Sequence, residues 1–269
     1  MSNNKTVLIT GATDGIGKEL ALSLISKGFD LIIHGRNQNK GDQLITELKK
    51  INSGCIVAYY NADLSSLARI NEMCRSIKSD FTNIDILVNN AGTIEKTRQI
   101  TEEGFEKSFA VNHLSMFLLT LKLIPLLQKD TPSKIINVST QIHSSSIDFD
   151  NLQGEKGYSP TGMYSSTKLL NIMFTYKLAN LLTHTNITVN CLHPGVINTK
   201  LLRMYWGGSG PKNSKTLEFM VLSPEIDNET GKYYSNSQIS KTHTISYDLD
   251  LQNKLWDISE KMVNYEFKL

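Results

Sequence analysis

The sequence lacks the features that mark several protein classes. Three cysteines occur in 269 residues, Cys55, Cys74 and Cys191, and their wide separation gives neither metal-ligand spacing nor a paired framework. The 28 basic and 26 acidic residues are spread through the chain without a basic block, so no footprint for nucleic acid is present. We therefore expect no disulfide scaffold, no metal site and no nucleic-acid partner.

An export signal and a long apolar run are also missing. The start, MSNNKTVLIT, has no charged region followed by a long apolar run and a cleavage site. The most apolar stretch, Leu114 to Leu127, contains Lys122 and Pro125 and is too short to span a bilayer. These features predict a cytoplasmic protein without a membrane anchor.

Short runs rich in branched aliphatic residues alternate with helical patterns. Buried parallel strands read as such runs, so the alternation predicts a doubly wound sheet with helices on both faces. A seventh strand near Gly231 to Tyr234 and a helix over Leu251 to Val263 complete a single α/β Rossmann-fold domain over residues 1–269, with a mainly parallel seven-stranded sheet. The first six strands are expected at Thr6 to Thr10, Leu31 to His34, Ile56 to Tyr60, Ile84 to Val88, Ile135 to Val138 and Ile187 to Cys191.

Polar residues indicate two helix starts and one loop. Thr101, followed by two glutamates, is typical of a helix N-terminus, and Asp63 or Ser65 is expected to cap the helix after the third strand. Gly207 to Pro211 predicts a mobile loop within a substrate segment at about 200–225.

The first strand leads into a glycine-rich turn and then a helical pattern. The turn, TGATDGIG, permits close backbone approach, and the amides and dipole of the helix start favour a pyrophosphate. A structural turn is the alternative, but the strand before it and the helix after it favour a dinucleotide. The expected contacts from this turn are Gly11, Thr13, Asp14, Gly15, Ile16 and Gly17.

Cofactor choice depends on the end of the second strand, which reads Gly35-Arg36-Asn37. A carboxylate there would bind the ribose hydroxyls of NAD, whereas an arginine accommodates a 2′-phosphate. Arg36, with Asn37 beside it, therefore favours NADP(H) over NAD(H), unless Arg36 is only a solvated surface residue.

Two later motifs offer further cofactor contacts. Asp63, followed by Leu64, either contacts the adenine or caps the next helix. The fourth strand ends in NNAG, from which Asn90, Ala91 and Gly92 are expected cofactor contacts. Its small residues would let the backbone approach the cofactor, and its asparagines would tie adjacent strands together. The alternative is a plain turn.

Four residues point to acid/base chemistry on a carbonyl or alcohol substrate. Tyr164 and Lys168 share one helix face, where the ammonium would lower the phenol pKa from about 10 and could also hold the nicotinamide ribose. Ser139 ends the fifth strand, where it can polarise a substrate oxygen. Asn112 interrupts an apolar helix and is either the holder of a proton-relay water or a satisfied core amide. Each residue alone also fits an ordinary surface, turn or core role.

These motifs, in this order, resemble the short-chain dehydrogenase/reductase family over most of the chain. The ordered set is TGATDGIG, NADL, NNAG, VNH, NVST, YSSTK and HPGVINT. The resemblance implies that Asn112, Ser139, Tyr164 and Lys168 form the catalytic tetrad, with the last two also contacting the cofactor. It further implies a set of residues against the nicotinamide, namely Pro194, Gly195, Val196 and Thr199.

Three segments are similar to the retinol dehydrogenase-like branch of that family, which includes the WW-domain oxidoreductases. They are TEEGFEKSFAVNHLSMFLLT, GKYY and LWDISEKMV. The resemblance implies NADP(H)-dependent hydride transfer on retinoids, lipid aldehydes or other apolar carbonyls. The apolar residues at 201–206 fit such a substrate or pack as core, and Ser115-Met116 replaces a Gly-His pair common in the branch.

A different class of function is a non-catalytic protein that senses NAD(P)H or docks a partner. The complete set of four residues favours the enzyme, because a sensor has no need of Tyr164 and Lys168 in register with Ser139. An apolar face on the helix from Tyr164 suggests a homodimer or homotetramer.

Overall fold

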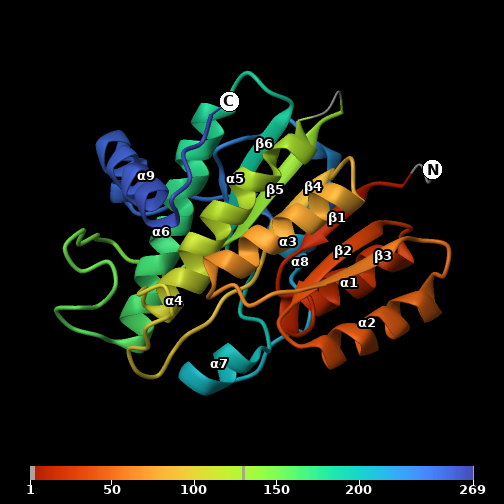
Figure 1. The fold of residues 1–269 in the computed structure, drawn as a ribbon, viewed down its shortest axis with the longest axis horizontal. Helices are drawn as coiled ribbons and strands as arrows, with labels where there is room; N and C mark the ends of the chain where they lie inside the picture. The colour runs from red at the N-terminus through yellow and green to blue at the C-terminus, as the bar shows by residue number, and fades with distance from the viewer. Residues whose placement is uncertain (1–3, 129–130, 269) are drawn as a thin grey trace.

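One eight-stranded sheet runs through the computed structural model, which describes residues 4–128 and 131–268 (Figure 1). The strand order is β3-β2-β1-β4-β5-β6-β7-β8, and only the β7–β8 pair is antiparallel among the described residues. The predicted α/β Rossmann class is therefore confirmed. The strands are β1 Thr6–Ile9, β2 Asp30–Gly35, β3 Val57–Asn61, β4 Ile86–Asn89, β5 Ser133–Val138, β6 Ile187–Leu192, β7 Tyr233–Ser235 and β8 Gln238–Ile239.

Helices cover both faces of this sheet. The layer of α3, α5 and α6 lies on one face with α9 outside it, and α1, α2 and α8 lie on the other (Figure 1). The α-helices are α1 Gly15–Ser26, α2 Gln38–Ile51, α3 Leu67–Asp80, α4 Lys107–Phe109, α5 Ser115–Leu127, α6 Pro160–Leu181, α7 Lys200–Tyr205, α8 Lys215–Leu222 and α9 Leu249–Val263. The other helical segments are the π-helix η1 Ala110–Leu114 and the 3-10 turns η2 Pro224–Ile226 and η3 Thr244–Tyr247.

Strand β1 shows why its sequence is continuously apolar. Val7 and Ile9 belong to the core under α1, α2 and α8, whereas Leu8 belongs to the core under α3, α5 and α6. Successive strand residues point to opposite faces, so a strand covered on both sides has no solvent-facing position. The six buried runs of the sequence are confirmed as β1 to β6 for this reason.

The strand order reverses between β1 and β4. Crossovers from β1 lead to β2 and β3 on one side, and the chain then returns to β4 on the other. In doubly wound sheets the crevice at the carboxyl ends of the two strands flanking such a switch point is the ligand site. The glycine-rich turn after β1 and the NNAG motif after β4 both lie there.

The sheet has one strand more than the seven that the sequence predicts. The seventh strand, expected near Gly231 to Tyr234, is confirmed as Tyr233–Ser235, and the chain then reverses through Asn236 and Ser237. Both turn residues have positive φ angles, which is typical of a tight two-residue hairpin. Strand β8 has two exposed residues, too few for a recognisable alternating pattern.

The predicted helix start at Thr101 is wrong. Thr101 lies in a turn, and helical structure begins at Lys107, where the carboxylate of Glu106 accepts the Phe109 N–H. The second of the two glutamates, Glu103, instead accepts the Leu67 N–H at the start of α3.

The predicted caps of α3 are also displaced along the chain. Ser66, rather than Asp63 or Ser65, is the N-cap, and its Oγ accepts the Arg69 N–H. Asp63 instead accepts hydrogen bonds from the backbone N–H and the hydroxyl of Ser65, which order the turn before the helix.

The apolar helix is longer than the sequence analysis expects. Segments α4, η1 and α5 form one continuous stretch, Lys107–Leu127, of 21 residues, and its most apolar window has a mean hydropathy of 1.6. By length and composition this helix could cross a membrane, so the expectation that the stretch is too short is wrong. Buried residues make up 83% of its most apolar window. A buried core helix can be as long and as apolar as a membrane-spanning helix, so length and hydropathy do not distinguish the two.

Helix α9 covers part of the apolar face of α6. Trp256 of α9 stacks on Phe174 of α6 and lies edge-on to Phe117 of α5, with ring centroids 5.9 and 5.0 Å apart. Part of the face suggested as a dimer interface is thus covered by the same chain.

Candidate active site

The turn after β1 forms a backbone cradle. Gly11 adopts a left-handed φ of +65°, which turns the chain sharply at the end of the strand. A Cβ on Gly17 would lie 2.5 Å from the Gly11 carbonyl oxygen, so only glycine allows this close approach. Asp14 caps α1 by accepting the Gly15 N–H at 2.9 Å. This geometry fits a pyrophosphate, which binds free amides at a helix N-terminus.

His34 at the end of β2 fastens the cradle to the sheet. Its Nδ1 accepts the Gly11 N–H at 3.2 Å, so Nε2 carries the proton and donates to the Ala62 carbonyl at 3.0 Å. Burial lowers the pKa of His34, which keeps the ring neutral and both hydrogen bonds intact.

Asparagines tie the strands together beside the switch point, as the sequence analysis suggests. Asn90 donates to the Thr10 carbonyl at 2.9 Å and joins β4 to β1. Asn89 donates to Asn137 Oδ1 at 2.8 Å, and Asn137 donates in turn to Thr175 on α6 at 2.9 Å. This buried network joins β4, β5 and the helix that carries Tyr164.

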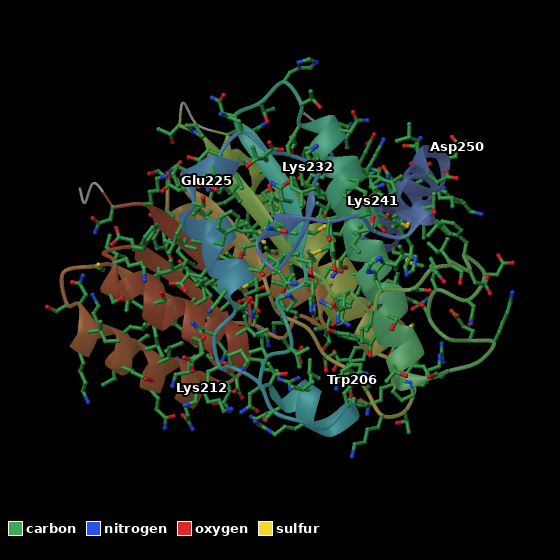
Figure 2. All side chains as sticks on the ribbon, turned by 180° about the vertical axis from the view of Figure 1, so that it is seen from behind. Trp206, Lys212, Glu225, Lys232, Lys241 and Asp250 are labelled. Carbon is green, nitrogen blue, oxygen red and sulfur yellow. The ribbon has the colours of Figure 1, made fainter. Side chains whose placement is uncertain are left out.

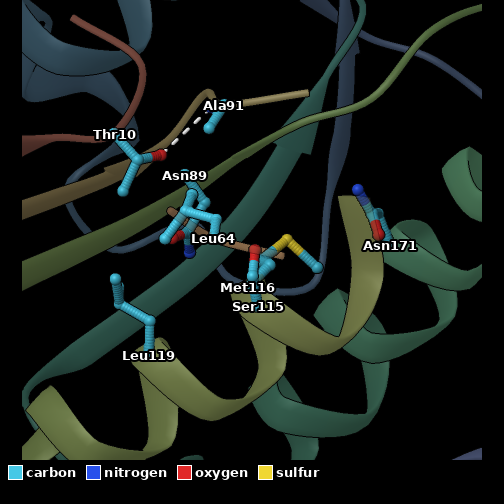
Figure 3. A pocket seen from close by; sticks show the side chains of 8 residues that line it. All are labelled: Thr10, Leu64, Asn89, Ala91, Ser115, Met116, Leu119 and Asn171. Carbon is cyan, nitrogen blue, oxygen red and sulfur yellow. Dashed lines mark hydrogen bonds between the residues drawn. The ribbon is translucent and has the colours of Figure 1, made fainter. Parts of the chain in front are cut away.

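A small cavity lies between these strand ends and α5 (Figure 3). The Thr10 hydroxyl oxygen accepts the Ala91 N–H at 3.0 Å on one side, and Ser115 and Met116 close the other. The cavity has room for about one water molecule, so it belongs to the packing behind the nucleotide site and not to a substrate pocket. Leu64 is buried against it.

The residues expected near the adenosine end lie around the carboxyl end of β2. Arg36 is exposed, and Asn37 caps α2 by accepting the Lys40 N–H at 3.0 Å. Asp63 is also exposed. Partial burial opposes its ionisation, but hydrogen bonds from Ser65 and the charges of Arg36 and Lys107 outweigh that effect and lower the pKa of Asp63.

Tyr164 and Lys168 lie one turn apart near the start of α6. The Lys168 Nζ is 5.5 Å from the centre of the Tyr164 ring and donates to the Val138 carbonyl at 2.9 Å. Lys168 is buried, whereas Tyr164 is half-buried. The spacing argument that placed both side chains on one face is confirmed.

The pKa values depart from the sequence-based expectation. Burial raises the pKa of Tyr164 to about 12 and lowers that of Lys168 to about 8. The expected lowering of the phenol pKa is therefore wrong for this structure. The ammonium lies over the ring and hydrogen-bonds to a backbone carbonyl, so desolvation of the phenolate dominates.

Ser139 and Asn112 reach the same helix. The buried Ser139 hydroxyl donates to the Lys168 backbone carbonyl at 2.9 Å. Asn112 lies in the π-helix η1, a form often found at functional sites. Its amide oxygen accepts the Thr93 N–H at 2.7 Å and its amide nitrogen donates to Thr167 at 3.0 Å, so the side chain is the satisfied amide that the sequence analysis names as an alternative.

Gly92 lies directly beside this cluster. A Cβ on Gly92 would be 3.4 Å from Asn112 Oδ1 and 3.6 Å from Lys168 Nζ. The four candidate catalytic residues and the NNAG motif therefore meet at the carboxyl edge of the sheet.

The segment after β6 lies across the glycine turn. A Cβ on Gly15 would be 3.5 Å from the Thr199 methyl group, and Thr199 caps α7 by accepting the Leu202 N–H. The Pro194 carbonyl accepts the Ser214 hydroxyl, Gly195 has a φ of +91°, and Val196 is exposed. This places Thr199, one of the four residues expected against the nicotinamide, next to the cradle.

Helix α7 lies over Tyr164 and has no buried residue. Trp206, which follows it (Figure 2), is 43% exposed. Its ring centre is 5.8 Å from that of Tyr164. Tyr205 donates to the Ile94 carbonyl at 3.1 Å. The alternative in which residues 201–206 pack as core is therefore wrong, and core contacts in the 200–225 segment come from α8.

Comparisons with known proteins agree with this geometry. A family model for short chain dehydrogenases matches residues 5–206. This chain belongs to the short-chain dehydrogenase/reductase family. It is 32% identical to human retinol dehydrogenase 14, an alignment that covers 98% of this chain and 87% of the relative. The chain is thus an NAD(P)-dependent oxidoreductase acting on CH–OH groups, in the retinol dehydrogenase-like branch.

Solved structures also resemble this short-chain dehydrogenase/reductase. An uncharacterized protein from Mycobacterium paratuberculosis has a TM-score of 0.80 and 25% identity, covering 98% of this chain and 95% of that one. Pseudomonas aeruginosa RhlG, solved as an NADP active-site complex, has a TM-score of 0.62 and 26% identity, covering 75% and 77%.

Three residues that hold the site together were missed from sequence. His34 fastens the glycine turn, and Thr93 and Thr167 hold Asn112. A histidine within an apolar strand, just before Gly35, was the one visible signal. The two threonines are ordinary in sequence, and their roles depend on contacts between distant elements.

Proposed function

We propose that this short-chain dehydrogenase/reductase prefers NADP(H) and interconverts an apolar carbonyl compound and its alcohol. The observation that carries the proposal is the cluster of Tyr164, Lys168, Ser139 and Asn112 beside the glycine cradle. When bound, the nicotinamide supplies or accepts hydride, and the protein supplies alignment and proton transfer.

Tyr164 is the proposed proton donor to the substrate oxygen. With its pKa raised to about 12, the phenol is protonated at neutral pH, which is the form that carbonyl reduction needs. The same chemistry in reverse, alcohol oxidation, requires the phenolate.

Ser139 and Lys168 assist this proton transfer in the proposal. The Ser139 hydroxyl now donates to the Lys168 carbonyl, and because hydroxyl groups rotate it can turn to a substrate oxygen. Lys168, with a pKa of about 8, carries a positive charge at neutral pH and favours negative charge developing on Tyr164. Asn112 positions the segment at Thr93 against α6.

The preference for NADP(H) over NAD(H) is supported by Arg36. It is exposed at the end of β2, where a guanidinium can bind a 2′-phosphate. The resemblance to the NADP complex of RhlG agrees with this choice. Asp63, whose pKa is lowered in part by the charge of Arg36, accepts hydrogen bonds from Ser65.

An apolar substrate is supported by the side chains around Tyr164. Val196, Met204 and Trp206 are exposed on the segment that lies over the site, and the relative is named for retinol. The proposal keeps a cytoplasmic protein of one domain, and within the described residues the apolar stretch Lys107–Leu127 is largely buried, as in a core helix.

Nucleotide binding and turnover test the proposal together. NADPH and NADH are titrated by fluorescence, and each is then assayed with aliphatic aldehydes, aromatic aldehydes, ketones and retinal. We expect tighter binding of NADPH and turnover that favours apolar carbonyls. Tight NADPH binding without turnover of any of these would instead favour a sensor, and no binding of either nucleotide would contradict the proposal.

A further inference from the structure

A short turn, residues 140–144, joins two of the candidate catalytic residues. It follows Ser139 directly at the end of β5. At its other end the Ser144 N–H donates to the Ser165 carbonyl at 3.0 Å, and Ser165 is the neighbour of Tyr164 in α6. One end of the turn is therefore fixed to Ser139 and the other to the helix position beside Tyr164, so the shape of the turn sets how the two hydroxyl groups face a substrate.

His143 is the buried side chain of this turn. It is 7% exposed, whereas Gln141 and Ile142 are exposed. Its Nδ1 donates to the Thr140 carbonyl at 2.8 Å and closes the turn. Because Nδ1 carries the proton, Nε2 is an acceptor, and it accepts the His243 backbone N–H at 3.3 Å. The neutral ring thus joins the turn to a segment 100 residues further along the chain.

The segment that receives this contact is 240–248, between β8 and α9, in which Figure 2 labels Lys241. It is fixed in turn to helix α6. Tyr176 of α6 hydrogen-bonds to the Thr242 hydroxyl at 3.0 Å and stacks on Tyr247, with ring centroids 5.1 Å apart. The turn at the active site is therefore linked to an anchored part of the fold.

We infer that His143 is a positioning residue, whose neutral ring holds the turn at 140–144 against the segment at 240–248 and so sets Ser139 relative to Tyr164. The inference rests on the proposed roles of Ser139 and Tyr164, through which His143 acts. A displacement of about 1 Å in a reacting group can cost about 100-fold in rate. Losing a buried contact this close to Ser139 should therefore slow turnover.

In the described part of the chain, ring contacts bring two other titratable side chains to His143. The rings of His243 and Tyr233 lie with their centroids 4.8 and 5.8 Å from that of His143. Burial lowers the pKa of His143, the hydrogen bond to Thr140 opposes this, and the charge of His243 adds to it. Burial raises the pKa of Tyr233, so its phenol is neutral and supplies no counter-charge. As pH falls below about 6.5, protonation of Nε2 sets two N–H groups against each other and breaks the contact with His243.

Two substitutions separate the roles of the two ring nitrogens. Asparagine places its amide near the position of Nδ1 and glutamine places its amide near that of Nε2, so His143→Gln can still accept the His243 N–H whereas His143→Asn cannot. His184→Gln, at an exposed histidine after α6, is the matched control.

Three measurements are made on the full chain at about pH 7.5, where His143 is neutral. Hydrogen exchange followed by mass spectrometry reports on 240–248, fluorescence titration gives the Kd for NADPH, and steady-state reduction of an aldehyde gives kcat and KM. Thermal melting checks that each variant is folded.

We expect His143→Asn to speed hydrogen exchange over 240–248 about 10-fold or more and to lower kcat about 5- to 20-fold. The Kd for NADPH and KM should change less than about 2-fold. His143→Gln should return exchange and kcat to within about 3-fold of the unaltered protein. Between about pH 7.5 and 5.5, kcat of the unaltered protein and of His184→Gln should fall relative to that of His143→Gln, which has no ring to protonate.

Unchanged exchange over 240–248 in His143→Asn would overturn the inference. A parallel loss of NADPH binding and kcat would also overturn it, because it would show a general loss of structure, as would equal losses of kcat in His143→Asn and His143→Gln. Loss of turnover in Tyr164→Phe with none of the changes expected of His143→Asn overturns the inference alone. If Tyr164→Phe reduces the aldehyde as fast as the unaltered protein, the proposed function fails and the inference fails with it.

Discussion

The substitution Gly17→Ala has two opposite effects on stability, a gain from the helix preference of alanine and a loss from a steric clash of the new Cβ. Gly17 lies in the first turn of α1, and alanine is favoured over glycine in helices by about 1 kcal/mol. The new Cβ would lie 2.5 Å from the Gly11 carbonyl oxygen and 2.6 Å from the Asn90 amide nitrogen. Asn90 is held by hydrogen bonds to the carbonyls of Thr10 and Gly11, so neither neighbour can move without disturbing the turn.

The steric effect should win. Overpacking against a fixed backbone costs about 1–3 kcal/mol, which exceeds or cancels the helix preference. We therefore expect the free energy of unfolding to fall by up to about 2 kcal/mol. Since the turn is the proposed pyrophosphate cradle, a displacement that costs about 1.4 kcal/mol of binding would weaken NADPH about tenfold.

Urea unfolding and fluorescence titration with NADPH measure the two effects. Gly157→Ala is the matched control, because a Cβ there meets nothing within 4 Å and Gly157 has no positive φ. The control should match the unaltered protein in both assays. A Gly17→Ala variant that is more stable than the unaltered protein and binds NADPH equally well would refute the reasoning.

Other perturbations test the buried His113, the strand network and the substrate wall. Burial lowers the pKa of His113 to about 3, so the unfolded state gains a proton first as pH falls below about 6.5. His113 should therefore account for a fall of about 2 kcal/mol in the free energy of unfolding between pH 7 and pH 5. Urea unfolding should show that this fall is absent in His113→Gln and present in the exposed His184→Gln. An equal pH dependence in both variants would contradict this prediction. Asn137→Ala strips partners from Asn89 and Thr175 and should lower the urea-measured stability by about 2–4 kcal/mol, and a loss below about 0.5 kcal/mol would argue against the network. Trp206→Ala should raise KM for apolar aldehydes about 5-fold or more in steady-state assays, with little change for acetaldehyde; a similar change for both would show that Trp206 does not contact substrate.

The sheet could be predicted because its strands are buried on both faces. Runs such as Leu31 to Ile33 are apolar at every position, which distinguishes them from surface strands and amphipathic helices. The amphipathic pattern predicted α9 from Leu251 to Val263, and the helix extends only two residues further at its start. Spacing alone also placed Tyr164 and Lys168 on one helix face.

The features that failed depend on contacts between distant segments. The helix start at Thr101 was misjudged because Glu103 caps a different helix, which no local pattern shows. The direction of the Tyr164 pKa shift depends on how much the fold desolvates the phenol. The ion pair between Asp14 and Lys200 joins residues 186 positions apart, so only the folded chain brings them together.

The central claim is that Tyr164 transfers the proton during carbonyl reduction, and Tyr164→Phe tests it most directly. Phenylalanine keeps the ring beside Trp206 and removes only the hydroxyl. Reduction of an aldehyde that the unaltered protein turns over should slow by about 100-fold or more, while the Kd for NADPH changes less than about 3-fold. A variant that reduces the aldehyde at an unchanged rate would contradict the account.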